Sequence, residues 1–229
     1  RDVAPSRGLG DVYKRQELEE KMKIQTFYLG SLMTNCYLVW NDKNEAYLFD
    51  CGGENIGRVE TFIKTHGLTL KYMVLTHGHG DHIAGLNRVK ELYPEATVYI
   101  GKEEESFLTE QELNLMKYIN GIGFTYDGDY VTVKEGDMVG EFKVLDTPGH
   151  TIGSKCFYNP ESKILISGDT MFKRSFGRYD LPTSDGTMLF NSLRKLCTEL
   201  PEDTKVYSGH SEVTTIGEEK AFLTMQGMI

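Results

Sequence analysis

Long apolar runs and an excess of basic residues are both missing from this sequence. None of its apolar segments approaches the roughly 20 residues that a membrane-spanning helix requires. Lys and Arg together number 25 against 34 Asp and Glu, so the formal net charge is −9. This charge argues against nucleic acid or an anionic membrane as the main partner. The first 21 residues also lack the apolar stretch of a secretory signal, and we therefore expect a cytoplasmic protein.

Cysteine is scarce and widely spaced. Cys36, Cys51, Cys156 and Cys197 form no CxxC pair. We interpret them as reduced residues of the core, with a site for a soft metal ion as the alternative. The remaining composition, 39% hydrophobic and 26% charged, is typical of a soluble globular chain.

The N-terminal segment 1–21 differs from the rest of the chain. Residues 6–16 read like a translated sequencing adapter, whereas Met22 opens a convincing first strand. We therefore expect residues 1–21 to be a non-native or disordered tail. The length fits one large domain or two small ones, and we interpret residues 22–229 as a single domain.

Short strands and helices are expected to be mixed from residue 22 onward. Runs of aromatic and branched residues predict strands at 24–29, 36–40, 46–49, 72–75, 97–100, 130–133, 142–145, 155–158, 163–166 and 205–207. Apolar residues at helical spacing predict helices at 56–66, 83–93, 189–200 and 216–225. Residues 102–128 predict short helices, which form either a lid that contacts substrate or ordinary surface helices. Two sheets packed face to face would fit this order, as would other α/β layouts.

The segment 76–82 is rich in metal-binding side chains. It contains His77, His79, Asp81 and His82, directly after the apolar run 72–75. Imidazole suits zinc, iron, copper or nickel, and a carboxylate adds a hard oxygen donor. The glycines between these residues are expected to let the backbone curl, so that the side chains converge. The segment therefore predicts a metal site, with a solvated loop as the alternative.

Three further ligand-type residues each follow a glycine at a predicted strand end. They are His150, Asp169 and His210. Strand ends on a rigid sheet can hold the side chains of a site in fixed positions. With segment 76–82 they make a set of seven, which exceeds the four ligands of a tetrahedral zinc ion. Two ions that share a carboxylate and hold a hydroxide between them would use such a set.

This pattern resembles the ligand set of the metallo-β-lactamase superfamily. The run HxHxDH followed by His150, Asp169 and His210 is similar to that family's ligands in order and type. The resemblance implies an α/β fold, a four-layer αββα sandwich with two mixed sheets packed face to face and helices outside. It also implies two metal ions, one held by His77, His79 and His150, the other by Asp81, His82 and His210, with Asp169 as the bridge.

Within the superfamily, the chain looks most like the short glyoxalase II-like (hydroxyacylglutathione hydrolase-like) branch. The segments that carry this resemblance are 34–39, 148–151, 176–182 and 214–220. It implies a dinuclear hydrolase of small, S-acylglutathione-like thioesters, in which a bridging hydroxide attacks the acyl carbon. Asp81 and Asp169 would be catalytic, Asp50 would orient a ligand, and Arg178 would contact substrate or pair with Asp180. Zinc is the expected metal, with iron and manganese as alternatives.

Other activities of the same scaffold remain as alternatives. A persulfide dioxygenase-like protein would use one iron ion with much the same ligands. A lactonase is less compatible, because that branch tends to place Tyr where Phe172 stands. The antibiotic-cleaving enzymes place Cys or Ser where Asp169 stands, which counts against that activity. A non-catalytic metal-binding protein would show a degraded ligand set, whereas this set is intact.

The expected partner is a small-molecule substrate, bound by a monomer or small homo-oligomer. Full-length glyoxalase II carries a C-terminal helical region that grips glutathione, whereas this sequence ends 19 residues after His210. The thiol carrier therefore stays open. Weaker candidates for the site are Thr76 and Asp146, which would brace ligands, and Tyr118, Phe124 and Tyr126, which line a pocket or lie in the core.

Overall fold

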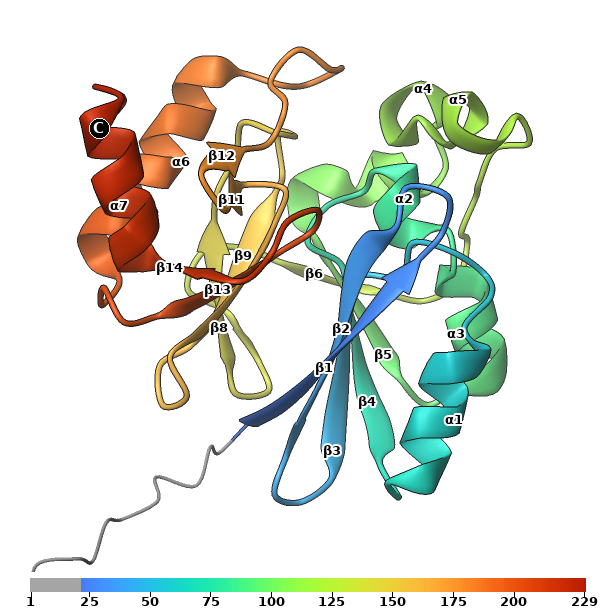
Figure 1. The fold of residues 1–229 in the computed structure, drawn as a ribbon. Helices are drawn as coiled ribbons and strands as arrows, with labels where there is room; N and C mark the ends of the chain where they lie inside the picture. The colour runs from blue at the N-terminus through green and yellow to red at the C-terminus, as the bar shows by residue number, and fades with distance from the viewer. Residues whose placement is uncertain (1–21) are drawn as a thin grey trace, which may run out of the picture.

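The computed structural model describes residues 22–229, so the predicted tail 1–21 lies outside the described residues. Two mixed sheets pack face to face and carry helices on their outer faces (Figure 1). The first sheet has the order β1-β2-β3-β4-β5-β6, with bounds Met22–Leu29, Thr34–Asn41, Glu45–Phe49, Thr69–Val74, Thr97–Gly101 and Val131–Val133. The predicted four-layer αββα sandwich is confirmed.

The second sheet has the order β14-β13-β10-β9-β8-β7. In that order its strands are Thr214–Thr215, Lys205–Ser208, Ile164–Gly168, Lys155–Asn159, Phe142–Asp146 and Met138–Val139. A separate two-stranded ribbon joins β11 (Met171–Phe172) to β12 (Ser175–Phe176). Each of the two large sheets contains both parallel and antiparallel neighbours.

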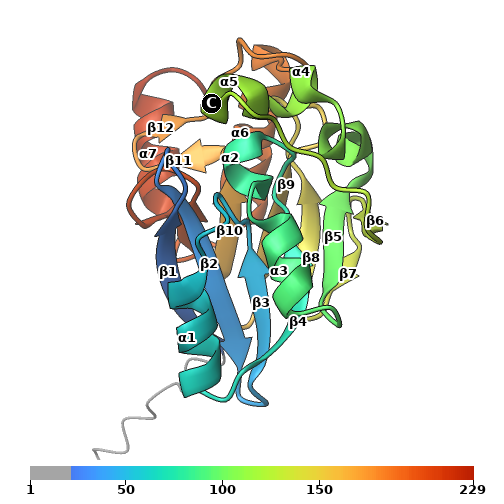
Figure 2. The ribbon, with the colours of Figure 1, turned by 90° about the vertical axis from the view of Figure 1, so that its right-hand side faces the viewer.

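Helices close the sandwich on both sides. The outer face of the first sheet is covered by α1 (Gly57–Thr65) and α3 (Leu86–Leu92), as Figure 2 shows. The second sheet is covered by α6 (Gly186–Glu199) and α7 (Ile216–Met225). Three apolar clusters follow from this layering, one between the sheets and one beneath each pair of helices. Phe49, Phe142 and Phe157 fill the middle cluster and are fully buried.

The predicted helix 83–93 is wrong as a single element. The chain instead forms α2 (Gly80–Ile83), ends it, and begins α3 at Leu86. Gly85 lies at the break, and a Cβ there would come within 2.2 Å of Cys51 Sγ. Close packing against the segment after β3 therefore requires glycine at this position. Glycine is a poor helix former, which is consistent with the break between α2 and α3. The strands β7, β11, β12 and β14 were not predicted, because two residues cannot display the alternation that identifies a strand.

One end of the sandwich gathers the short elements of the chain. The helices α2, α4 (Gln111–Asn114) and α5 (Met116–Asn120) lie there beside the β11–β12 ribbon (Figure 1). The strands β4, β8, β10 and β13 also point their carboxyl ends to this end, so the segments that follow them meet across the seam between the sheets.

None of the helices within residues 22–229 combines the length and the apolar character needed to cross a membrane. All four cysteines are free and buried, as expected for core residues.

Candidate metal centre

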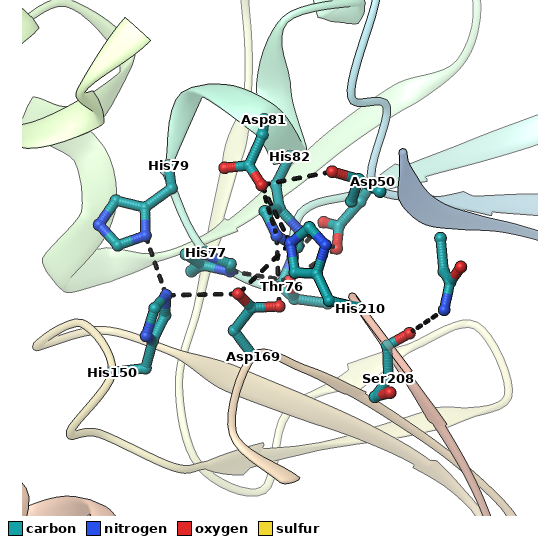
Figure 3. A network of polar contacts seen from close by, with 12 residues as sticks. Asp50, Thr76, His77, His79, Asp81, His82, His150, Asp169, Ser208 and His210 are labelled. Atoms are coloured by element: carbon teal, nitrogen blue, oxygen red, sulfur yellow. Dashed lines mark hydrogen bonds and ion pairs between the residues drawn. The ribbon is translucent and has the colours of Figure 1, made fainter. Parts of the chain in front are cut away.

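The segment after β4 contributes four of the predicted ligands from the side of the first sheet. His77 and His79 precede α2, and Asp81 and His82 lie within it. His77, His79 and His82 are almost completely buried. The turn is held in place because the backbone of Cys51 donates to the carbonyl of His82 over 2.7 Å. The four side chains therefore lie close together, with His79 toward His150 and Asp81 and His82 toward His210 (Figure 3).

The second sheet supplies the other three predicted ligands. Asp169 follows β10, His210 follows β13, and His150 follows β8 after a short turn. His150 Nε2 lies 2.9 Å from His79 Nδ1, so the two sides of the site meet there. Asp169 lies in the middle, as Figure 3 shows. Its Oδ1 is 3.3 Å from His82 Nε2, and its Oδ2 is 3.6 Å from both His150 Nε2 and His210 Nε2.

The donor atoms fit a pair of divalent ions. Three sets of residues each bring their ligand atoms within 4.8 Å of one another: His77, His79 and His150; His77, His82 and Asp169; and Asp81, His82 and His210. Among the described residues, the buried Nε2 atoms of His77, His79 and His82 and the Oδ1 of Asp169 have no hydrogen-bond partner. Buried polar atoms are normally paired, so unpaired nitrogens and a carboxylate oxygen aimed at one space suit metal coordination.

Burial sets the protonation state of the inner histidines. It holds the pKa of His77 well below its usual value, and together with His150 it lowers the pKa of His79 to about 3. Both rings are therefore neutral at pH 7, which is the form that binds metal. Burial alone would raise the pKa of Asp169, but His82 outweighs it and holds that pKa below its usual value. The carboxylate is thus ionised and ready to coordinate.

Asp50 braces the ligand turn, as the sequence suggested. Its Oδ2 lies 2.8 Å from His82 Nδ1, which fixes the orientation of that ring. The same carboxylate accepts from the backbone and the hydroxyl of Thr76, at 2.8 and 2.7 Å. Thr76 Oγ1 lies 3.1 Å from His77 Nδ1. Asp50 therefore contacts His82 directly and His77 through Thr76. Asp146 has no such role in the structure, because it pairs with Lys155 at 2.8 Å.

A buried glutamate that sequence reasoning missed joins the two ligand segments. Glu104 lies in the 3₁₀ helix η1 (Lys102–Leu108) and is 0% exposed. Its carboxylate accepts from the backbone N–H of Gly78, between two histidine ligands, at 2.8 Å. It also accepts from the N–H of Gly153, three residues after His150, at 2.8 Å. Glu104 and Phe107 are three residues apart and lie on the same face of a 3₁₀ helix, but this spacing alone does not show that the face is buried.

Backbone contacts position the ligands from the second sheet. The carbonyl of Arg178 lies 2.8 Å from His150 Nδ1 and fixes that ring. The side chain of Arg178 makes two bonds to Asp180, at 2.9 and 3.0 Å, in an exposed ion pair and not a buried one. Asn35 of β2 donates to the carbonyl of Ser208 at 2.9 Å, which ties the first sheet to the segment that carries His210.

The glycines of the ligand segments are required by packing. We expected Gly78 and Gly80 to be needed for a backbone conformation that other residues avoid. This is wrong, because neither glycine has a positive φ. A Cβ on Gly78 would come within 2.3 Å of Phe107, and one on Gly80 within 2.6 Å of Met116. Both glycines therefore let the neighbouring helices approach the metal-binding turn.

A cavity of about 830 Å³ opens over the predicted ligands. Its floor includes His79, Asp81, His150, Asp169 and His210. Its walls come from the β1–β2 turn, from α4 and α5, and from the segment 172–182. Residues 111–119 therefore do border the site, as one interpretation of segment 102–128 held. Of the aromatic candidates in that segment, Tyr118 lines the cavity, whereas Phe124 and Tyr126 lie in the core.

Comparison with known proteins places the chain in a family. Residues 29–210 match the model of the metallo-β-lactamase superfamily. The probable metallo-hydrolase YqgX of Bacillus subtilis is 34% identical over 87% of this chain and 95% of its own length. The hydroxyacylglutathione hydrolase GloC of Haemophilus influenzae is 31% identical over 87% of this chain and 95% of its own length.

Solved structures support the same assignment. BLEG-1, described as a B3 metallo-β-lactamase, superposes with a TM-score of 0.81 at 35% identity, over 87% of this chain and 97% of BLEG-1. A di-iron-bound form of TTHA1623 has a TM-score of 0.77 at 33% identity, over 85% of this chain and 96% of TTHA1623. Family model, relatives and fold agree with the His and Asp cluster, and the chain therefore belongs to the metallo-β-lactamase superfamily as a metallo-hydrolase.

Proposed function

We propose that this chain is a dinuclear metal-dependent hydrolase of small thioesters. The observation that carries the proposal is the central position of Asp169. One of its oxygens faces His82, and the other faces both His150 and His210. A carboxylate placed in this way suits a bridge between an ion held by His77, His79 and His150 and another held by Asp81, His82 and His210.

The reaction would take place where the cavity meets the ligands. Two bound divalent ions would supply a water of lowered pKa as the nucleophile and would polarise the carbonyl oxygen of the substrate. Asp81 faces the cavity as an ionised carboxylate, because burial, which would raise its pKa, is outweighed by His82 and His210, which lower it. We assign Asp81 the role of holding the proton that the attacking water gives up, and Asp169 the role of fixing both ligand sets. Asp50 and Glu104 keep the ligand segments in register.

The chemical balance is that of simple hydrolysis. One water adds its oxygen to the acyl carbon, and the carbon–sulfur bond breaks with its electron pair on sulfur. The thiolate then takes the proton that the water gave up, and the new carboxylic acid loses its own proton to solvent. The products are a carboxylate, a thiol and one proton. No oxidant or reductant is required.

The similarity to GloC supports a thioester, because that relative is named a hydroxyacylglutathione hydrolase. The similarity to BLEG-1 suggests a second candidate, β-lactam hydrolysis, whereas Asp169 counts against it.

The metal is zinc, iron or manganese, all of which accept these ligands, and the relative TTHA1623 has been seen in a di-iron form. We place the protein in the cytoplasm on account of its four free, buried thiols. We treat residues 22–229 as one domain, because segments that follow strands of both sheets contribute to the site. We expect this domain to act as a monomer or small homo-oligomer.

The test is a metal count combined with a substrate panel. We expect two metal ions per chain and turnover of S-lactoylglutathione, with slower or no turnover of a penicillin, a lactone and a persulfide. Oxygen uptake with the persulfide would show the iron-dependent alternative. Fewer than one metal ion per chain, together with no thioester turnover, would refute the proposal. The variant Asp169→Ala should lose one metal ion and most activity, and full retention of both would refute the bridging role.

A further inference from the structure

The cavity above the ligands has predominantly apolar walls. Leu32, Leu115, Ile119, Phe172, Phe176 and Leu181 line it from three separate segments of the chain. Leu32 lies on the turn before β2 and is 52% exposed, so an apolar side chain faces solvent at the edge of the cavity. Apolar residues from three segments that face one space are typical of a small-molecule site, where apolar walls provide affinity and a few polar groups orient the ligand.

Charged groups that could hold an anionic substrate are nearly missing from these walls. Outside the predicted metal ligands, the charged residues that line the cavity are Glu112 and Arg178. Glu112 would repel an anion. Arg178 already gives two of its five N–H donors to Asp180 in an exposed ion pair, so a substrate carboxylate would share the guanidinium with a carboxylate of like charge. A thiol carrier with two free carboxylates, such as glutathione, therefore finds one cation among the lining residues, and that cation already has a carboxylate partner.

Leu115, which lines the cavity, has a backbone conformation that is unusual for a leucine. This residue lies between α4 and α5 with φ 61° and ψ 7°, in the left-handed region. Glycine or asparagine is the usual residue at such a helix end, since a branched side chain is strained there. The next helix also ends in a left-handed residue, and there the chain does carry a glycine, Gly121. Strain that persists beside a candidate site motivates a functional hypothesis.

We propose that the cavity binds an apolar acyl chain. The natural substrate is then a thioester of such a chain with a thiol carrier that has no free carboxylates near its sulfur atom. Leu115 and Ile119 of the α4–α5 segment act as specificity-determining residues that contact this chain. The proposal rests on the thioester hydrolase function, which it narrows from small thioesters in general to those with an apolar acyl group. The hydrolytic step itself is unchanged.

The test separates the acyl group from the carrier. Four thioesters are compared with the metal-loaded protein: lactoyl and octanoyl esters, each on glutathione and on the neutral thiol N-acetylcysteamine. We expect the octanoyl ester of N-acetylcysteamine to have the highest kcat/KM. In a series from butanoyl to octanoyl, kcat/KM should rise about fourfold per added methylene group until the chain fills the cavity.

Two variants link the effect to the wall. Leu115→Gly removes the side chain and relieves the strained backbone, so the protein should fold with an unchanged melting temperature or a higher one. Its kcat/KM for the octanoyl ester should fall about tenfold, and that for the lactoyl ester less than twofold. Ile119→Ala should act in the same direction. Ile122→Ala is the matched control, because Ile122 follows the same helix, is 88% exposed and does not line the cavity.

The outcomes distinguish this inference from the function on which it rests. Preference for S-lactoylglutathione, or a rate independent of acyl length, would overturn the inference and leave the thioester hydrolase intact. An equal loss of lactoyl and octanoyl activity in Leu115→Gly would also overturn it. If all four thioesters are inert while metal is bound, the proposed function itself is refuted, and this inference with it.

Discussion

Removing the carboxylate of Glu104 is expected to weaken metal binding without touching a ligand. Its two oxygens accept from Gly78 and Gly153, each at 2.8 Å, and these glycines belong to the two segments that carry His77, His79 and His150. The site therefore depends on a side chain that joins two segments far apart in the sequence. The variants of interest are Glu104→Ala and Glu104→Gln.

The size of the effect follows from the two hydrogen bonds. Each buried N–H left without a partner costs about 1–3 kcal/mol, so Glu104→Ala should destabilise the fold by about 2–6 kcal/mol. Glu104→Gln keeps the shape and one acceptor oxygen, and should cost about half as much. At about 2–4 °C per kcal/mol for a chain of this size, the melting temperature should fall by at least 4 °C in the Ala variant. Loosened ligand segments should weaken metal affinity about 10-fold to 100-fold.

The assay measures metal affinity by competition with a chelator and stability by thermal unfolding. Glu105→Ala is the control, because Glu105 is the next residue of the same helix and is exposed. That variant should stay within about 0.5 kcal/mol of the parent chain. Unchanged metal affinity in Glu104→Ala, or an equal loss in Glu105→Ala, would refute the reasoning.

Three further predictions concern the ligands and their neighbours. Asp50→Asn keeps a residue type that tolerates the left-handed φ of 58°, and it should lower metal affinity about 10-fold to 100-fold by loosening His82, as measured by chelator competition. Gly209→Ala places a Cβ 2.2 Å from Asp169 Oδ1 and should abolish most activity in a folded protein. Gly57→Ala should not, because its Cβ would only make an ordinary contact with Asn55 at 3.9 Å. Chelation should lower the melting temperature by about 5–10 °C, and a smaller shift would show that metal and fold are uncoupled.

The candidate ligands could be selected from the sequence because each of them follows a strand with an apolar core pattern. The run 72–75 identifies β4 as a buried strand, and the ligand-rich segment follows it directly. His150, Asp169 and His210 likewise follow predicted strands, and the structure brings all of them to one end of the sandwich. Strand periodicity and the direction of the chain are local properties, so they fix which residues reach that end.

The supporting contacts were not readable, because they depend on packing between distant segments. Glu104 is one of three consecutive glutamates, and composition alone suggests an acidic surface. Only the fold shows that it is buried between two glycines. The contact between Arg178 and His150 was likewise not predicted, because the backbone carbonyl of Arg178 makes it. Residue type carries no information about a contact that is made by the main chain.

The distribution of ligands between the sheets links metal binding to the stability of the sandwich. Each proposed ion would take ligands from both sides: His77 and His79 against His150, and Asp81 and His82 against His210. The two sheets are otherwise joined near the site by few polar contacts, among them those that Asn35 and Tyr37 make to the carbonyl of Ser208. Bound ions would therefore act as cross-links at the open end of the sandwich, where the apolar layer between the sheets gives way to the cavity. Because this end lacks the packing of the core, loss of metal should loosen it before the layers beneath α1, α3, α6 and α7, and amide exchange should increase first in the ligand segments.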